Sequence, residues 1–169
     1  MLNFTPIDRA APGSLAILLR QSYAPLLGSG VSIWHQEADG WEQFDREAYI
    51  NSQVGRCVFL TWSDEALVGF ASFDPRRAPE TALIGHHCVT AAFRQQGIGR
   101  MQFHELLRRI DRLRVAEIHA TTLSLPFFEA ARHLYISCGF AVVARSPWPH
   151  DPTVDRIEFV KRFNQSSRA

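Results

Sequence analysis

Apolar residues along this chain of 169 residues follow two periods, and each period predicts one kind of element. Spacings of three and four predict a helix over 12–27, with Leu15, Leu18 and Leu19 on its buried face. They also predict helices over 41–54, from Gly97 onward and over 126–138. Short runs rich in β-branched and aromatic residues predict strands over 2–7, 57–62, 66–73, 81–90, 117–122, 140–145 and 156–163.

The predicted element order is β-α-α-β-β-β-α-β-α-β-β. Helices interleaved with strands predict an α/β (α+β) fold, with a central mixed β-sheet flanked by helices. No linker composition divides the chain, so we expect a single domain over 1–163 and a frayed tail over 164–169. Residues 31–40 and 146–155 are expected to be loops, the second because it holds three prolines.

Charge and cysteine content exclude several classes of protein. Eighteen Lys and Arg against seventeen Asp and Glu leave a net charge of +1, so we expect no nucleic-acid partner. The opening MLNFTPIDRA lacks a basic start followed by an apolar run, and LAILL is too short to span a bilayer. We therefore expect a cytoplasmic protein with no membrane partner. Cys57, Cys88 and Cys138 include no CxxC pair, which favours packing thiols and predicts no metal.

The stretch FRQQGIGR (93–100) connects a predicted strand to a predicted helix. The free N–H groups and the macrodipole at a helix N-terminus favour an anion, and Gly97 and Gly99 let a phosphate approach the backbone. Arg94 and Arg100 add positive charge on either side. The P-loop string is absent, and Gln102 stands where the Rossmann fingerprint needs its third glycine. The sequence therefore predicts a different kind of diphosphate site.

Two segments resemble the GNAT acetyltransferase superfamily. HCVTAAFRQQGIGRMQF (87–103) resembles the family's coenzyme A signature. AARHLYISCGF (130–140) is similar to a second family segment, with Tyr135, Gly139 and Phe140 in place. The predicted element order agrees with the family over nearly the whole chain. The resemblance implies a GNAT-like fold and an acetyltransferase that uses acetyl-CoA as its acetyl donor.

The resemblance also implies how the coenzyme is held. The pantetheine arm would bind along the strand like an additional strand, and the pyrophosphate would bind backbone amides of the turn. The implied cofactor-binding residues are His87, Cys88, Val89, Thr90, Arg94, Gln95, Gln96, Gly97, Ile98, Gly99 and Arg100. One departure is Phe128, which replaces an Asn that the family often carries near the start of the second helix.

Tyr135 is implied by the same resemblance to be the catalytic acid that protonates the leaving thiolate. The alternative is that it is a half-buried aromatic residue of the core.

The base that deprotonates the amine is predicted to be a histidine. His86 and His87 are adjacent on a strand, so their side chains point to opposite faces. Relatives with a base in this strand carry it at the places of Leu83 or Gly85, which share the parity of His87, so we favour His87. The alternative is a histidine that packs beside a helix with its nitrogens bonded to backbone. His35, Glu37 and Asp39 are rival bases.

Acceptor binding is expected in the segments IWHQEADGW (33–41) and SPWPHDP (146–152), which combine aromatic with ionisable residues. The predicted substrate-binding residues are Trp34, His35, Glu37 and Trp148. The alternative is that the tryptophans cap the core.

The predicted function is acetyl-CoA-dependent transfer of an acetyl group directly to an amine of a small molecule, by a monomer or homodimer. No Ser-His-Asp or Cys-His-Asp arrangement points to a covalent enzyme intermediate, and apolar neighbours disfavour Cys88 as a nucleophile. Two other functions stay open: a non-catalytic acyl-CoA-binding sensor, and a peptide or protein N-terminal acetyltransferase.

Overall fold

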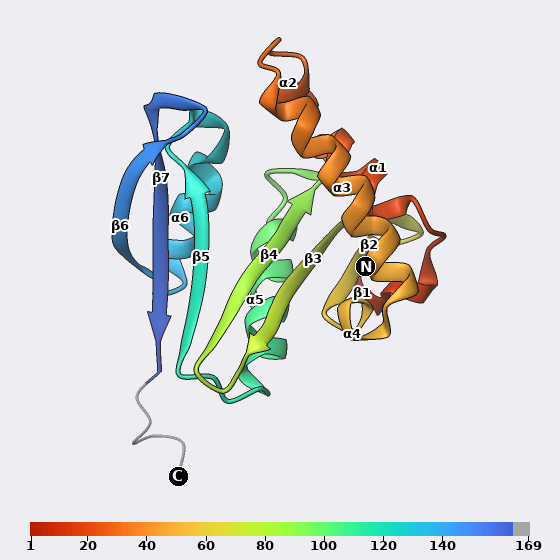
Figure 1. Ribbon diagram of the computed structural model, residues 1–169. Coiled ribbons are helices and arrows are strands. Elements are labelled where there is room, and N and C mark those ends of the chain that lie inside the picture. Colours follow the sequence, from red (N-terminus) through yellow and green to blue (C-terminus); the bar gives the residue numbers. More distant parts are fainter. Residues whose placement is uncertain (164–169) are drawn as a thin grey trace. The chain divides into compact units, whose positions relative to one another are not determined.

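The computed structural model describes residues 1–163, in which seven strands form one mixed sheet in the order β1-β2-β3-β4-β5-β7-β6 (Figure 1). The described chain groups into two compact units, and β3 and β4 contribute residues to both. The first unit holds Met1–Phe73 and His86–Leu107, and the second holds Asp74–Gly85 and the chain from Arg108 onward. The predicted α/β (α+β) fold with a mixed sheet flanked by helices is confirmed, whereas the single domain over 1–163 stays a prediction. The tail predicted over 164–169 lies outside the described residues.

The first unit contains the N-terminal helices and the first strands. Its elements are β1 (Leu2–Pro6), α1 (Ser14–Ser22), α2 (Ala24–Leu27), α3 (Ile33–Ile50), α4 (Ser52–Gly55) and β2 (Val58–Ser63). It also includes most of β3 (Ala66–Arg77), the end of β4 (Thr81–Val89) and α5 (Ile98–Asp111) up to Leu107. β1 and β3 both pair antiparallel with β2.

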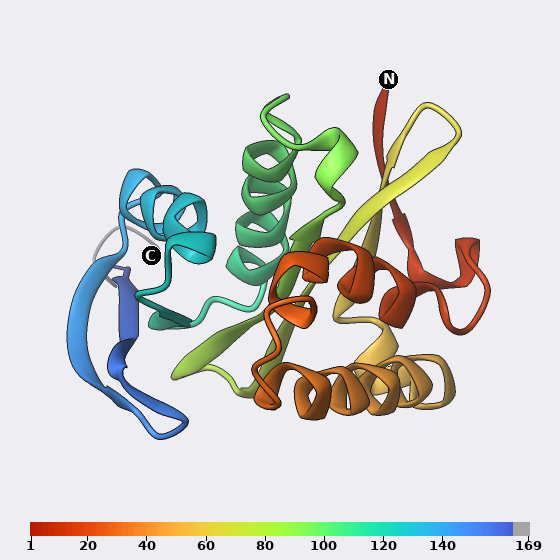
Figure 2. The ribbon, with the colours of Figure 1, turned by 90° about the horizontal axis from the view of Figure 1, so that it is seen from above.

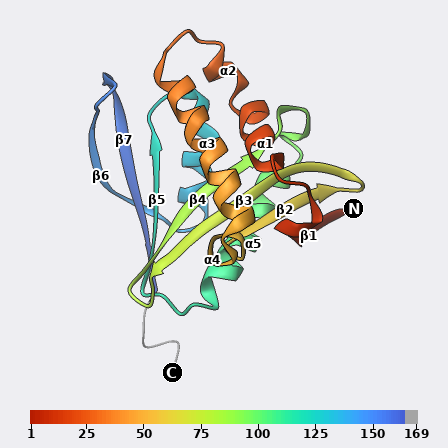
Figure 3. The same ribbon diagram turned by 45° about the vertical axis from the view of Figure 1, so that its right-hand side comes forward.

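Helices cover both faces of the sheet in this unit. Figure 2 shows α1 and α3 on one face and α5 on the other, and Figure 3 shows α3 running across the strands beside α1. The face under α1 and α3 holds a buried cluster that includes Leu15, Leu19, Trp41 and Phe70. On the α5 face, Phe103 and Leu106 have no exposed surface. Burial of these apolar side chains is the main stabilising contribution to the unit.

The two N-terminal helices differ from their predicted bounds. The helix predicted over 12–27 breaks at Tyr23 into α1 and α2, because Pro25 follows as one of the first residues of α2. The helix predicted over 41–54 begins at Ile33 instead, so the loop predicted over 31–40 is wrong. The cause is a continuous buried stripe at three- and four-residue spacing, which Gly40 interrupts at a cost of only about 1 kcal/mol. The stripe consists of Trp34, Ala38, Trp41, Asp45 and Ala48.

The second unit is built on the C-terminal strands β5 (Glu117–Leu123), β6 (Ala141–Trp148) and β7 (Asp151–Arg162), with α6 (Glu129–Ser137). β5 pairs in parallel with the first residues of β4, and β7 pairs antiparallel with both β5 and β6. The loop predicted over 146–155 is also wrong, because β6 and β7 continue through it as a hairpin. Pro147 is tolerated because β6 is an edge strand, and Pro149 lies in the turn. Pro152 lies in β7 between Asp151 and Asp155, where the register of the hairpin shifts.

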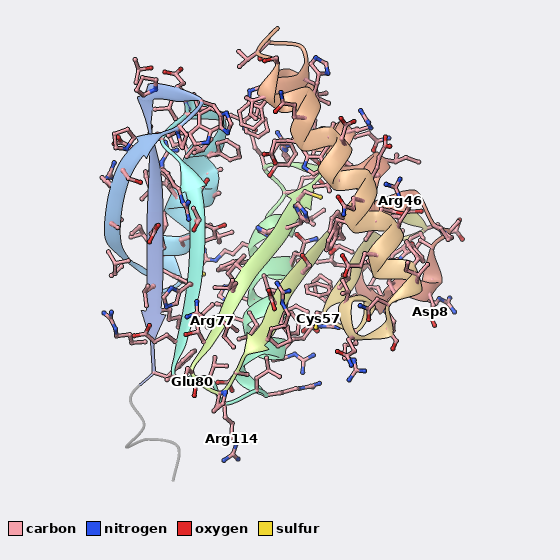
Figure 4. All side chains as sticks on the ribbon, viewed as in Figure 1. Asp8, Arg46, Cys57, Arg77, Glu80 and Arg114 are labelled. Carbon is pink, nitrogen blue, oxygen red and sulfur yellow. The ribbon has the colours of Figure 1, made fainter. Side chains whose placement is uncertain are left out.

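Several charged residues lie at the surface, whereas all three cysteines are buried. Figure 4 labels Arg77, Glu80 and Arg114, which are exposed residues around the β3–β4 and α5–β5 connections. Cys57, also labelled, is buried and donates to the Gln53 carbonyl at 3.4 Å. Among the described residues no group of three or more His, Cys, Asp or Glu could hold a metal ion, and no disulfide bond joins the three cysteines.

Candidate functional site

The turn between β4 and α5 has the geometry of an anion-binding loop. A short 3₁₀ turn (Ala91–Phe93) follows β4, and α5 then begins at Ile98. Gln95 and Gly97 adopt left-handed torsions, with φ of +59° and +77°. Alternation of right- and left-handed residues aims successive backbone N–H groups at one concave point. The positive end of the α5 macrodipole lies at the same turn.

The first turn of α5 supplies N–H donors. Met101 donates to the Gly97 carbonyl at 3.1 Å, so the amides of Ile98, Gly99 and Arg100 precede the first intrahelical bond. A Cβ built at Gly97 would meet no atom within 4 Å, and one at Gly99 would meet only a Val89 methyl, at 3.9 Å. The space above both glycines is open, so the turn fits a phosphate group.

The two arginines of the turn play different parts. Arg94 donates from Nε to the Val89 carbonyl at 3.1 Å and from Nη2 to the Ser22 carbonyl at 2.6 Å. Its guanidinium is therefore engaged with backbone of β4 and α1. Arg100 is exposed in the first turn of α5, where a positive charge can face an anion.

The end of β4 presents alternating side chains to the two faces of the sheet. His86 packs on Phe44 of α3, with ring centroids 4.7 Å apart. His87 points to the opposite face, where its ring lies 5.2 Å from that of Phe103 and its Nε2 lies 3.1 Å from the Gly99 carbonyl. A carbonyl only accepts, so Nε2 carries the proton and Nδ1 keeps the free lone pair.

Burial controls the protonation of the residues on β4. It lowers the pKa of His86 and of His87 to about 4, and the bond to the Gly99 carbonyl partly opposes this for His87. Both imidazoles are therefore neutral at pH 7. Burial raises the pKa of the Cys88 thiol to about 11, which removes the thiolate that a nucleophile would need.

The second segment of the sequence pattern positions Tyr135 in the last turn of α6. Gly139, at φ +85°, takes the C′ position after α6. Phe140 N–H bonds the Tyr135 carbonyl at 3.1 Å, and Gly139 N–H bonds that of Ile136 at 3.0 Å. This pair of bonds is a Schellman motif. The Tyr135 ring then packs against Phe140 and Phe159, with centroids 5.8 and 5.3 Å away.

Tyr135 keeps its phenolic proton over the physiological pH range. Only 6% of the residue is exposed, and burial raises the pKa of its hydroxyl to about 12. A group in this state can donate a proton but does not act as a base at neutral pH.

The predicted substrate-binding residues lie on two different elements. Trp34 is buried in α3 and packs as a core residue, whereas His35 and Glu37 are exposed on the same helix. Trp148 is half-buried at the end of β6, and its ring lies 5.0 Å from that of His150 in the hairpin turn. Burial of Trp34 agrees with the packing role that the sequence left as an alternative, and the four substrate-binding assignments stay predictions.

Asp45 is a buried residue to which the sequence analysis assigned no role. Its carboxylate, on α3, accepts from the N–H groups of Gly13, Leu15 and Ala16 at 2.7, 2.8 and 3.2 Å. It satisfies the otherwise free donors at the start of α1 and complements the helix dipole. The sequence feature that could have indicated this role is an acidic residue on the otherwise apolar stripe of α3.

The chain carries a glycine turn after β4 and, further along, Tyr135 before the glycine of the Schellman motif. This order is shared by one family of enzymes. The model of the Acetyltransferase (GNAT) family matches residues 21–140. The chain belongs to this family. Among curated proteins, none matches this sequence.

Solved structures of acetyltransferases share the fold at low sequence identity. A GNAT-family protein from Desulfovibrio desulfuricans has a TM-score of 0.75 at 19% identity, over 96% of this chain and 99% of its own. A protein from Salmonella typhimurium, determined with acetyl-CoA, has a TM-score of 0.70 at 19% identity, over 97% and 95%. An aminoglycoside 6′-acetyltransferase has a TM-score of 0.67 at 18% identity, over 95% and 96%. Within residues 1–163, no helix is long and apolar enough to cross a membrane.

Proposed function

We propose that this GNAT-family protein is an N-acetyltransferase that moves the acetyl group of acetyl-CoA directly to an amine, and that the acceptor is a small molecule. The observation that carries the proposal is the turn after β4. There, two left-handed residues and the free first-turn amides of α5 form a cradle over open space. A diphosphate matches this cradle in charge, and the open space above both glycines leaves room for a phosphate group.

In this proposal the coenzyme occupies the turn and the adjoining end of β4. The amides of Gln95, Gln96, Gly97, Ile98, Gly99 and Arg100 hold the pyrophosphate. The pantetheine arm bonds the backbone of His87, Cys88, Val89 and Thr90 in the manner of an added strand. Thr90 N–H bonds Val68 of β3 at 2.8 Å, so by strand alternation the backbone groups of Val89 and His87 point away from β3.

The chemistry is a direct aminolysis of the thioester. The amine nitrogen attacks the acetyl carbonyl carbon, the C–S bond breaks, and the amide and the free coenzyme A thiol are the products. Tyr135 donates its phenolic proton to the leaving sulfur, and His87 accepts the amine proton at Nδ1. The high pKa of the Cys88 thiol supports transfer without an acyl-cysteine intermediate.

The acceptor class is supported by the hairpin turn of β6 and β7. Trp148 and His150 combine there an aromatic face with an ionisable ring, which suits a small cationic or aromatic amine. Among proteins of this fold, one is named as an aminoglycoside acetyltransferase and another is the NatC complex bound to a peptide. Small amines and peptides are therefore the two acceptor classes to compare.

The test is thiol release from acetyl-CoA with amines, polyamines, amino acids, aminoglycosides and N-terminal peptides. We expect release with one class of small amine and a lower turnover for Tyr135→Phe. His87→Gln keeps an N–H donor for the Gly99 carbonyl but no basic nitrogen, so we expect its turnover to fall as well. Unchanged turnover in His87→Gln would contradict the base assignment alone. Tight coenzyme binding without release for any acceptor would instead identify an acyl-CoA sensor.

A further inference from the structure

The Arg94 side chain donates hydrogen bonds to two backbone carbonyls that belong to different elements. The Val89 carbonyl is the last of β4, and the Ser22 carbonyl is the last of α1. Both bonds lie within the first compact unit. The guanidinium therefore connects the glycine turn, the end of β4 and the end of α1.

The Ser22 carbonyl is available because α1 stops at this point. Tyr23 is the C-cap of α1 and at the same time the N-cap of α2, and its own carbonyl receives the N–H groups of Leu26 and Leu27. The last carbonyls of a helix carry its negative dipole end, and a cation that bonds them is stabilised. Ser22 is 1% exposed and Arg94 is exposed, so the bond is part-buried, with its acceptor side shielded from water.

The Val89 carbonyl points away from β3, toward the strand edge where the proposed function places the pantetheine arm. A carbonyl accepts two hydrogen bonds, so the Arg94 bond fixes its direction and still leaves one lone pair. Only arginine offers several N–H donors in a rigid planar fork, and a lysine ammonium is a point charge on a flexible stem.

We propose that Arg94 is a positioning residue that holds the end of β4 and the end of α1 in place for the acyl-pantetheine part of the donor, and that it is not a ligand of the diphosphate. This inference rests on the proposed function and revises the cofactor-binding role that the family resemblance implies for Arg94. Arg100, exposed at the same turn, carries the positive charge toward the diphosphate.

Two donor substrates separate these roles. Acetyl-CoA contains the diphosphate, whereas S-acetylpantetheine has the same thioester arm without it. For Arg94→Gln we expect kcat/KM to fall at least tenfold with both donors and by the same factor. For the control Arg100→Gln we expect a fall with acetyl-CoA and a change of less than twofold with S-acetylpantetheine. A loss in Arg94→Gln that is confined to acetyl-CoA, or no loss with either donor, would overturn the proposal.

The conservative variant gives a second criterion. Arg94→Lys keeps the charge but cannot bond both carbonyls in one geometry, so we expect it to lose as much as Arg94→Gln. Recovery of most of the activity by lysine would show that charge alone matters, as for a phosphate ligand. Thermal unfolding of each variant establishes that the protein compared is folded.

Hydrogen exchange of the wild type tests the same idea if the variants do not fold. We expect coenzyme A to slow amide exchange over 22–27 as well as over the turn at 93–101, because Arg94 links the two. Protection confined to 93–101 would argue against the link. If the wild type releases no thiol, the proposed function has failed. The role of Arg94 is then tested by calorimetry, which compares how Arg94→Gln and Arg100→Gln change the affinity for coenzyme A and for pantetheine.

Discussion

Gly97 is the position where the turn depends most on the absence of a side chain. Its φ of +77° lies in the left-handed region, where an L-residue costs about 1–2 kcal/mol. Gly99, two residues on, is helical, and its Cβ would meet only a methyl group of Val89 at ordinary contact distance. Alanine at a helical glycine stabilises by about 0.5–1 kcal/mol. The two substitutions therefore change the free energy of unfolding in opposite directions.

The size of the thermal shift follows from the length of the chain. For a domain of this size each kcal/mol corresponds to about 2–4 °C in Tm. Gly97→Ala should lower Tm by about 2–8 °C, and Gly99→Ala should raise it by about 1–4 °C. Gly97→Asn should lie closer to the wild type, because asparagine tolerates left-handed torsions better than alanine. Differential scanning calorimetry measures all three.

Coenzyme affinity should follow the geometry of the turn and not the stability of the fold. Relaxing φ at Gly97 turns an amide away from the diphosphate, and the loss of one hydrogen bond to a charged group, about 1.5–3 kcal/mol, weakens binding about 10- to 150-fold. Gly97→Glu adds a repelling carboxylate and should bind less still, whereas Gly99→Ala keeps its helical torsion and should lose less affinity than Gly97→Ala. Calorimetric titration with coenzyme A gives these constants. Equal losses in Gly97→Ala and Gly99→Ala, or unchanged affinity in Gly97→Glu, would refute the cradle.

Three further outcomes follow from the buried groups. Asp45→Ala leaves three N–H groups at the start of α1 without their acceptor, so it should lower the free energy of unfolding in urea by about 2–4 kcal/mol. The control Asp39→Ala, at an exposed site of α3, should cost under about 0.5 kcal/mol. Equal costs for the two variants would contradict the capping role of Asp45. Tyr135→Phe should lower turnover about 100-fold or more at unchanged coenzyme affinity. Because the pKa of Tyr135 is raised to about 12, the pH–rate profile of the wild type should show no inflection from this residue between pH 6 and 9. Because the pKa of His87 is lowered to about 4, the unfolded state binds more protons than the folded state between about pH 4 and 6.5. The stabilising contribution of neutral His87 is therefore full above pH 6.5 and is lost as the pH drops toward 4, so the stability of His87→Gln should fall less steeply over this range. An unchanged slope would show that His87 does not cause this pH dependence.

Several features of the site could be predicted from the sequence because they depend on local geometry. The glycines at 97 and 139 mark positions where the chain needs positive φ, and both were predicted at the correct ends of helices. The Schellman motif then fixes which turn of α6 carries Tyr135. The helix over 33–50 could have been predicted as well, since its buried stripe is continuous through Gly40.

The sequence by itself determined the order of the elements, the family and the glycine turn, because periodicity and backbone torsions are properties of residues close in the chain. The tertiary structure decided everything that needs a partner far along the chain. It placed Asp45 under the start of α1, directed Arg94 to the carbonyl of Ser22, and turned His86 and His87 to opposite layers. A guanidinium beside a glycine turn looks like a phosphate ligand in the sequence. Only the fold shows that two backbone carbonyls, one of them 72 residues away, already hold it.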